Sequence, residues 1–212
     1  MTASSHAKAA LLLALASLAL LKLGALEICT AGRCHALTLD AELLSQLHAW
    51  RTPVFDFFFQ VVTWAGSLYV LLPLALLLAA LDTRSTHVYQ RWFVPLALLS
   101  HWPVVHAAKL LIARPRPNLF EALIALPTDG SFPSAHAAQI TIFACAYWLR
   151  PGQRTAPALA IALLIAVLTV ALSRLYLQVH YPSDVLFAAG AAVLWVLALR
   201  NAGRNYPNSL CE

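Results

Sequence analysis

Three short segments carry most of the side chains that could perform chemistry in this sequence. They are Lys109–Pro117, Pro133–His136 and Ser173–Asp184. Together they hold several cations, a serine beside a histidine, and a second histidine four residues before an aspartate. Arginine and lysine side chains with nearby hydroxyl donors match the oxygens of a tetrahedral dianion such as phosphate. The residue types therefore predict a phosphate site that also contains groups for nucleophilic and acid–base chemistry.

The cations Lys109, Arg116 and Arg174 are the candidate phosphate ligands, together with the hydroxyl of Ser134. We expect a helix to begin near Ser134, and the free backbone N–H groups at a helix start favour an anion. Such a group of donors would also stabilise the charge on five-coordinate phosphorus during reaction.

The two histidines have different predicted roles. Asp184 lies four residues after His180, and Pro182 between them suits the first turn of a helix. An aspartate that hydrogen-bonds one ring nitrogen fixes the tautomer and leaves the other nitrogen free to attack phosphorus. His136 would protonate the leaving oxygen and later act as base on water. This pattern predicts a phosphohistidine intermediate that is then hydrolysed.

The elements that position these side chains are membrane helices. Hydrophobic residues make up 61% of the 212 residues and charged residues only 11%, whereas soluble domains carry about a quarter charged residues. This composition excludes a soluble globular protein, a disordered chain and a small disulfide-stapled protein. The net charge of +5 indicates basic loops beside anionic lipid and an anionic substrate, rather than a nucleic-acid partner. We predict one all-α integral-membrane domain over residues 1–212.

Six continuous apolar runs predict six transmembrane helices in a bundle, since a span needs about 20 apolar residues. They are Ala9–Leu26, Phe57–Leu81, Trp92–Ile112, Ala137–Leu149 with a start near Ser134, Ala156–Leu172 and Val185–Leu199. The first run is longer than the usual signal-peptide core, so we interpret it as a retained span. All three reactive segments then fall on one membrane face.

The loop after the first span has two features of its own. Cys29 and Cys34 would form a small disulfide loop in an oxidising compartment, and two unpaired thiols are an equally good interpretation. Leucines at helical spacing up to Trp50 predict a short interfacial helix that lies on the membrane and covers a lipid access route.

Orientation cannot be decided by a raw count of basic residues, which is a tie. With the N-terminus in the cytoplasm, the inner residues are Lys8, Arg84, Arg91, Arg150, Arg154, Arg200 and Arg204. The outer residues are Lys22, Arg33, Arg51, Lys109, Arg114, Arg116 and Arg174. If the three phosphate cations are set aside, the remaining excess places both termini in the cytoplasm and the site outside.

At the reactive segments the sequence resembles the type-2 phosphatidic acid phosphatase superfamily. The family pattern is K-x6-R-P, then P-S-G-H, then S-R-x5-H-x3-D, over about a third of the chain. All positions match except that Ala135 replaces the glycine. Alanine keeps its N–H donor but excludes a backbone conformation that only glycine tolerates. The stretch Thr63–Ser67 is also similar to a family feature.

The resemblance implies a residue-by-residue assignment. His180 would be the nucleophile, Asp184 its orienting partner and His136 the general acid and base. The phosphate ligands would be Lys109, Arg116, Ser134, Arg174 and the N–H of Ala135. It further implies a lipid phosphatase without metal or cofactor in the bacterial inner membrane, acting on a lipid phosphate or pyrophosphate, with undecaprenyl pyrophosphate as the expected substrate. Oligomeric state stays open.

Several alternatives remain open. Phosphatidylglycerophosphate or lipid A would serve equally as substrate, and a phosphotransferase would use the same phosphohistidine with a lipid acceptor. A transporter would need charges near midspan and inverted repeats, and a non-catalytic lipid-binding protein would not need both histidines. His101 and His106 do not share a helical face as a metal pair would. Arg114 is expected to contact a second phosphate or lipid headgroups.

Overall fold

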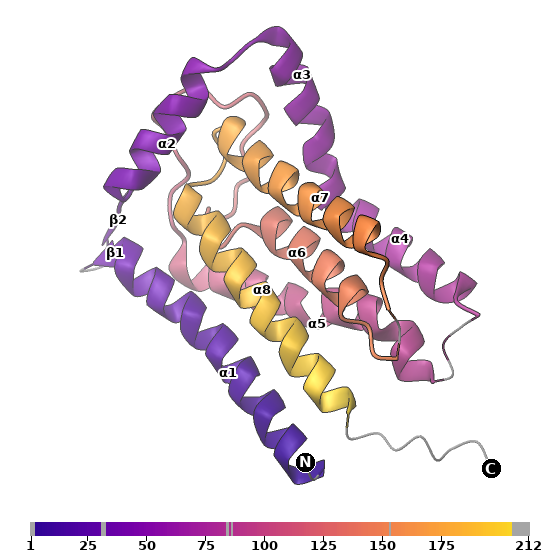
Figure 1. The fold of residues 1–212 in the computed structure, drawn as a ribbon. Coiled ribbons are helices and arrows are strands. Elements are labelled where there is room, and N and C mark those ends of the chain that lie inside the picture. Colours follow the sequence, from indigo (N-terminus) through magenta and orange to yellow (C-terminus); the bar gives the residue numbers. More distant parts are fainter. Residues whose placement is uncertain (1–2, 31–32, 84, 86, 153, 205–212) are drawn as a thin grey trace, which may run out of the picture.

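A computed structural model describes residues 3–30, 33–83, 85, 87–152 and 154–204 and shows a mostly helical chain (Figure 1). Its helices, in chain order, are α1 Ala3–Ile28, α2 Thr38–Ala49, α3 Pro53–Val62, the 3-10 turn η1 Thr63–Gly66, α4 Leu68–Leu81, α5 Val88–Ile112, α6 Ala135–Trp148, α7 Pro157–Tyr176 and α8 Pro182–Gly203. The predicted all-α class is confirmed. Arg84 of the inner basic set lies outside the described residues.

Helix α6 forms the centre of the bundle. It packs against α4, α5, α7 and α8, and the side chains from Ala137 to Ala144 are all buried. Helix α1 lies along α8 at the edge (Figure 1). Glycine permits this contact, because a Cβ at Gly24 would lie 2.7 Å from the ring of Phe187. Small residues at such contacts are typical of membrane helix pairs.

Length and composition support fewer spans than the six predicted. Helices α1, α5, α7 and α8 are each long and apolar enough to cross a membrane, and the bent pair α3–η1 with α4 adds a fifth if taken as one span. Helix α6 has only 14 residues, about 21 Å at 1.5 Å per residue, against a hydrocarbon core of about 30 Å. Six spans therefore stay a prediction.

The second predicted span, Phe57–Leu81, is wrong as a continuous helix. The chain bends by 50° between the segment ending at Gly66 and α4. Ser67 caps α4, and its hydroxyl accepts a hydrogen bond from the N–H of Tyr69. A Cβ at Gly66 would lie 2.5 Å from Cγ1 of Val170 on α7 and 3.1 Å from Cβ of His136 on α6. The break thus brings the backbone of η1 against the start of α6.

The loop after α1 forms a two-stranded antiparallel hairpin, β1 Cys29–Thr30 with β2 Arg33–Cys34. A disulfide joins Cys29 and Cys34, which decides between the two alternatives for these cysteines in favour of the disulfide.

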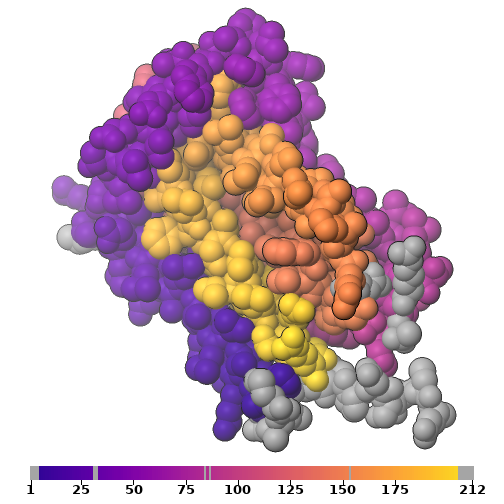
Figure 2. Space-filling view, viewed as in Figure 1, coloured from indigo at the N-terminus to yellow at the C-terminus, as the bar shows by residue number. Residues whose placement is uncertain are grey.

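Helix α2 follows the hairpin and covers one end of the bundle (Figure 2). Leu44 and Leu47 are buried, whereas Leu39 and Trp50 are exposed. Asp40, a charged residue in the first turn of α2, is also buried. The predicted helix exists, and part of its leucine stripe packs on protein rather than facing outward.

Candidate active site

The three reactive segments meet at one end of the bundle, as the span pattern predicts. Lys109 lies in the last turn of α5, Ser134 precedes α6, and Arg174 lies in the last turn of α7. His180 follows α7 in a connecting loop, and Asp184 lies in the first turn of α8. These five side chains are all buried. Burying a group of ionisable side chains in a membrane protein costs free energy, so such a group is by default a candidate functional site.

The loop after α7 directs His180 back toward the bundle. Gln178 takes a left-handed backbone conformation, with φ of 58°. Its buried amide donates a hydrogen bond to the carbonyl oxygen of Leu44 on α2. The N–H groups of Val179 and His180 both donate to the carbonyl oxygen of Arg174. Helix α2 and the last turn of α7 together fix the histidine.

The two ring nitrogens of His180 face opposite charges. Its Nδ1 lies 3.5 Å from Oδ2 of Asp184, and its Nε2 lies 3.4 Å from a guanidinium nitrogen of Arg116. Asp184 also caps α8, because its Oδ2 accepts from the N–H of Tyr181. One nitrogen therefore faces a carboxylate while the other faces the cation cluster.

The surroundings of His180 favour its neutral form. Burial is the main cause that lowers the pKa of His180 well below its ordinary value, and the charges of Arg174, Lys109 and Arg116 lower it further. A neutral imidazole retains a lone pair, so it meets the chemical requirement for attack on phosphorus.

Arg174 is held by a residue from the broken second span. One of its terminal nitrogens donates to Oγ1 of Thr63 in η1 at 2.5 Å. Thr63 was not predicted from the sequence to be a site residue, although the stretch Thr63–Ser67 is similar to a feature of the family. The Nε of Arg174 is buried and has no hydrogen-bond partner among the described residues.

An acidic residue that the sequence did not indicate lies between the other two cations. Asp129 contacts Nζ of Lys109 at 3.2 Å and a guanidinium nitrogen of Arg116 at 2.5 Å. Burial alone would raise the pKa of Asp129, but Lys109 and Arg116 outweigh it and hold this pKa below its ordinary value. An ionised carboxylate thus lies against two of the predicted phosphate ligands.

The start of α6 presents further donors. Ser134 is the N-cap residue, and its buried hydroxyl has no hydrogen-bond partner among the described residues. Ala135 is the first helical residue, a conformation that alanine adopts readily. The glycine of the family pattern is therefore not needed for backbone conformation at this position.

A cavity of about 510 Å³ opens beside His136 between α4, α5 and α6. Its walls include Leu72, Pro73 and Trp102, with Gln139 and His106 as polar members. His101 is buried against the ring of Trp195 instead, so the two histidines of α5 do not form a metal pair. Among the described residues, no group of three or more histidine, cysteine, aspartate or glutamate side chains is placed to hold a metal ion.

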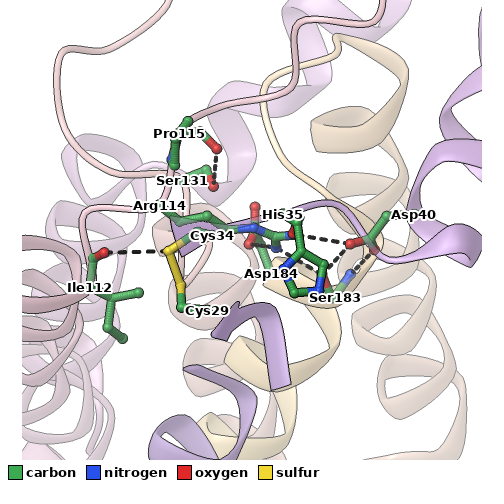
Figure 3. The surroundings of a disulfide bond; sticks show 10 residues. All are labelled: Cys29, Cys34, His35, Asp40, Ile112, Arg114, Pro115, Ser131, Ser183 and Asp184. Carbon is green, nitrogen blue, oxygen red and sulfur yellow. Dashed lines mark hydrogen bonds and ion pairs between the residues drawn. A yellow bond between two sulfur atoms is a disulfide. The ribbon is translucent and has the colours of Figure 1, made fainter. Parts of the chain in front are cut away.

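Arg114 does not reach a second phosphate or the lipid headgroups as expected. It is buried and forms ion pairs with Asp40 and with Asp184 (Figure 3). This contact could not be predicted from local sequence patterns, because Asp40 lies on α2, far from Arg114 along the chain.

A bundle of apolar helices with this group of cations and histidines at one end is the arrangement of a membrane enzyme for phosphorylated lipids. A family model described as the PAP2 superfamily matches residues 90–206, more than half of the chain. The chain belongs to the PAP2 superfamily, and the predicted enzyme class, a lipid phosphatase, is confirmed.

The solved structures that are similar to the chain include the following two. One is the transmembrane PAP2-type phosphatidylglycerolphosphate phosphatase from Bacillus subtilis, with a TM-score of 0.75 and 19% identity over 92% of this chain and 98% of that one. The other is Aquifex aeolicus LpxE, with a TM-score of 0.66 and 25% identity over 77% of this chain and 95% of that one. A comparison with curated protein sequences finds no match.

Proposed function

We propose that this protein removes phosphate from a phosphate monoester or pyrophosphate of a membrane lipid through a phosphohistidine on His180. The observation that carries this proposal is the placement of the buried His180 ring, with Nδ1 at 3.5 Å from Asp184 and Nε2 at 3.4 Å from Arg116. This geometry provides one orienting group and one anion-binding group for the two nitrogens.

The reaction proceeds in two balanced steps. Nε2 of His180 attacks phosphorus, the bond to the leaving oxygen breaks, and His136 donates a proton to that oxygen. Asp184, whose Oδ2 lies 3.5 Å from Nδ1, balances the positive charge that the ring develops and would accept a hydrogen bond from Nδ1–H as it forms. His136 then takes a proton from water, whose oxygen attacks phosphorus and releases inorganic phosphate and free His180.

Four side chains and one backbone group hold the phosphate. These are Lys109, Arg116, Arg174 and Ser134 with the N–H of Ala135. The buried Oγ of Ser134 and Nε of Arg174 support the assignment, because buried polar groups usually have partners and these two have none among the described residues. Asp129 supports it as well, since Lys109 and Arg116 already bind a carboxylate there.

The apolar cavity beside His136 accommodates the lipid part of the substrate. Its lining contains no Lys, Arg, Asp or Glu, so it suits a hydrocarbon chain better than a charged headgroup. The loop from Asn118 to Phe132 leaves little room for an elaborate headgroup-binding domain. We propose undecaprenyl pyrophosphate as the substrate, with phosphatidylglycerophosphate as the alternative.

We propose six membrane crossings, with α3–α4 as one bent span and the short α6 as the sixth. Helix α6 is surrounded by other helices, so its length need not match the lipid. Helix α2 would lie at the membrane surface, where its exposed Leu39 and Trp50 face lipid.

The site faces the outside in this proposal, in a bacterial inner membrane with both termini in the cytoplasm. The Cys29–Cys34 disulfide lies at the site end, and disulfides persist in oxidising compartments. The start of α1 and the end of α8 lie at the other end (Figure 1). Without the three phosphate cations and the buried Arg114, three basic residues remain at the site end against six described ones at the other, which fits the positive-inside rule.

A panel of lipid substrates tests the function. Purified protein in detergent micelles is given undecaprenyl pyrophosphate, phosphatidylglycerophosphate, lipid A phosphate or phosphatidic acid, and inorganic phosphate is measured. We expect phosphate release, fastest from undecaprenyl pyrophosphate. A higher kcat/KM for another lipid would overturn the substrate assignment. The assay is repeated with an acceptor lipid added to the lipid phosphate. If no inorganic phosphate is released in either assay and a phosphorylated acceptor lipid forms in the second, the protein is a phosphotransferase.

A further inference from the structure

We propose that Arg114 is a positioning residue for the reaction, which holds Asp184 in place for His180 and joins both to α2 through Asp40. The inference rests on the proposed function, because it assumes that His180 is the nucleophile.

Arg114 is the first arginine after α5 and occupies one of the variable positions of the K-x6-R-P pattern. Its side chain is 1% exposed, so it reaches neither solvent nor lipid headgroups. One terminal nitrogen donates to Oδ1 of Asp184 at 2.5 Å and to Oγ of Ser183 at 2.8 Å. The other donates to Oδ2 of Asp40 at 2.9 Å and to the carbonyl oxygen of His35 at 2.8 Å.

The guanidinium therefore joins two carboxylates that lie 144 residues apart in the sequence. Figure 3 shows Arg114 between Asp40 on one side and Asp184 on the other, with the Cys29–Cys34 disulfide nearby. Asp40 is fixed independently, because its Oδ1 accepts from the N–H of Ser183 and its Oδ2 from the hydroxyl of the same serine. The start of α8 is thus attached to α2.

The two oxygens of Asp184 have separate partners. Oδ1 is bound to Arg114, and Oδ2 accepts from the N–H of Tyr181 and faces Nδ1 of His180. The Arg114 guanidinium also lies 3.9 Å from the centre of the Tyr181 ring. A planar cation with fixed donor directions sets the orientation of a carboxylate, which a lysine ammonium does not. Arg114 thereby decides which oxygen of Asp184 His180 meets.

The same contacts place a cation against Asp184, which favours its ionised form beside a buried histidine. When Nε2 attacks phosphorus, the imidazole becomes cationic and needs the negative charge of Asp184. A buried carboxylate without a cation would be strongly disfavoured. Arg114 supplies that cation, and Asp40 holds the guanidinium from the opposite side. Helix α2 is in this way part of the catalytic arrangement, although no residue of α2 is assigned to phosphate.

Arg114→Gln tests the inference in the full-length enzyme. We expect kcat for lipid phosphate to fall about 100-fold, the loss typical of a misplaced catalytic group. The inhibition constant of inorganic phosphate should stay within about threefold, because Lys109, Arg116, Arg174 and Ser134 are untouched. Arg114→Lys should recover part of the loss, because a lysine reaches only one carboxylate. Arg51→Gln is the matched control, since Arg51 at the same end donates to the carbonyl oxygens of Glu121 and Tyr176, and its kcat should stay within about twofold.

Two results would overturn the inference. One is a kcat of Arg114→Gln within about twofold of the wild type. The other is a parallel loss of kcat and of phosphate affinity, which indicates a general structural role. If Arg114→Gln does not fold, the double variant Asp40→Asn/Arg114→Gln leaves fewer unpaired buried charges and must show the same selective loss in kcat. A wild-type enzyme that releases no phosphate would contradict the proposed function instead.

Discussion

The Nζ atom of Lys109 lies 3.2 Å from a carboxylate oxygen of Asp129. Arg116 binds the other oxygen of the same carboxylate. Two of the three proposed phosphate cations are therefore already paired with an anion of the protein. Asp129 is 39% exposed and lies in the segment between α5 and α6, so a substrate phosphate can replace it without unfolding a helix.

Removing this internal competitor should strengthen phosphate binding. We expect Asp129→Asn to lower the inhibition constant of inorganic phosphate about fivefold, which corresponds to about 1 kcal/mol for a partly exposed ion pair. Glu121→Gln is a suitable control, because Glu121 lies in the same segment and its backbone carbonyl, not its carboxylate, contacts Arg51. An unchanged or higher inhibition constant in Asp129→Asn would show that Asp129 supports phosphate binding rather than competing with it.

The pH dependence of the reaction should reflect the neutral His180. An attacking imidazole must be unprotonated, and burial with nearby cations lowers the pKa of His180 well below its ordinary value. The fraction of neutral His180 therefore stays high until the pH falls well below 6.5. We expect the midpoint of the acid limb of kcat/KM to lie below pH 6.5. A midpoint at or above that value would mean that His180 is exposed to water or paired more closely with a carboxylate.

The hydroxyl of Thr63 should influence catalysis through Arg174. Thr63→Val keeps the side-chain shape but removes the acceptor at 2.5 Å from the guanidinium. A hydrogen bond to a charged group contributes about 1.5–3 kcal/mol, so we expect kcat/KM to fall at least about tenfold. Thr169→Val provides the control, because the Thr169 hydroxyl donates only to Ile165 within α7. Equal effects of the two substitutions would exclude a specific role for Thr63.

The sequence predicted the meeting of the reactive segments because apolar runs define helix ends and each segment lies at such an end. Lys109, Ser134 and Arg174 fall at the same end once the runs between them are taken as helices. Asp184 could be placed beside His180 from spacing alone, since Pro182 starts a helix. These conclusions depend on local periodicity, which a single sequence carries well.

Other features depend on contacts between distant segments and could not be predicted. The sequence stays apolar across Gly66, so hydropathy does not indicate the break before α4. The break depends on the packing of this segment against α6 and α7. Asp40 is polar within an amphipathic helix, and only its partner Arg114 explains its burial. The contact of Asp129 with Lys109 depends on the path of an irregular segment that has no periodic pattern.

The most direct test of the account is the rate of phosphate release by His180→Ala on the lipid that the wild type hydrolyses fastest. The account predicts a loss of at least about a thousandfold, as expected when a nucleophile is removed. His48→Ala, whose ring stacks on Phe120 outside the reactive segments, should retain activity within about threefold. Full activity of His180→Ala would contradict the mechanism.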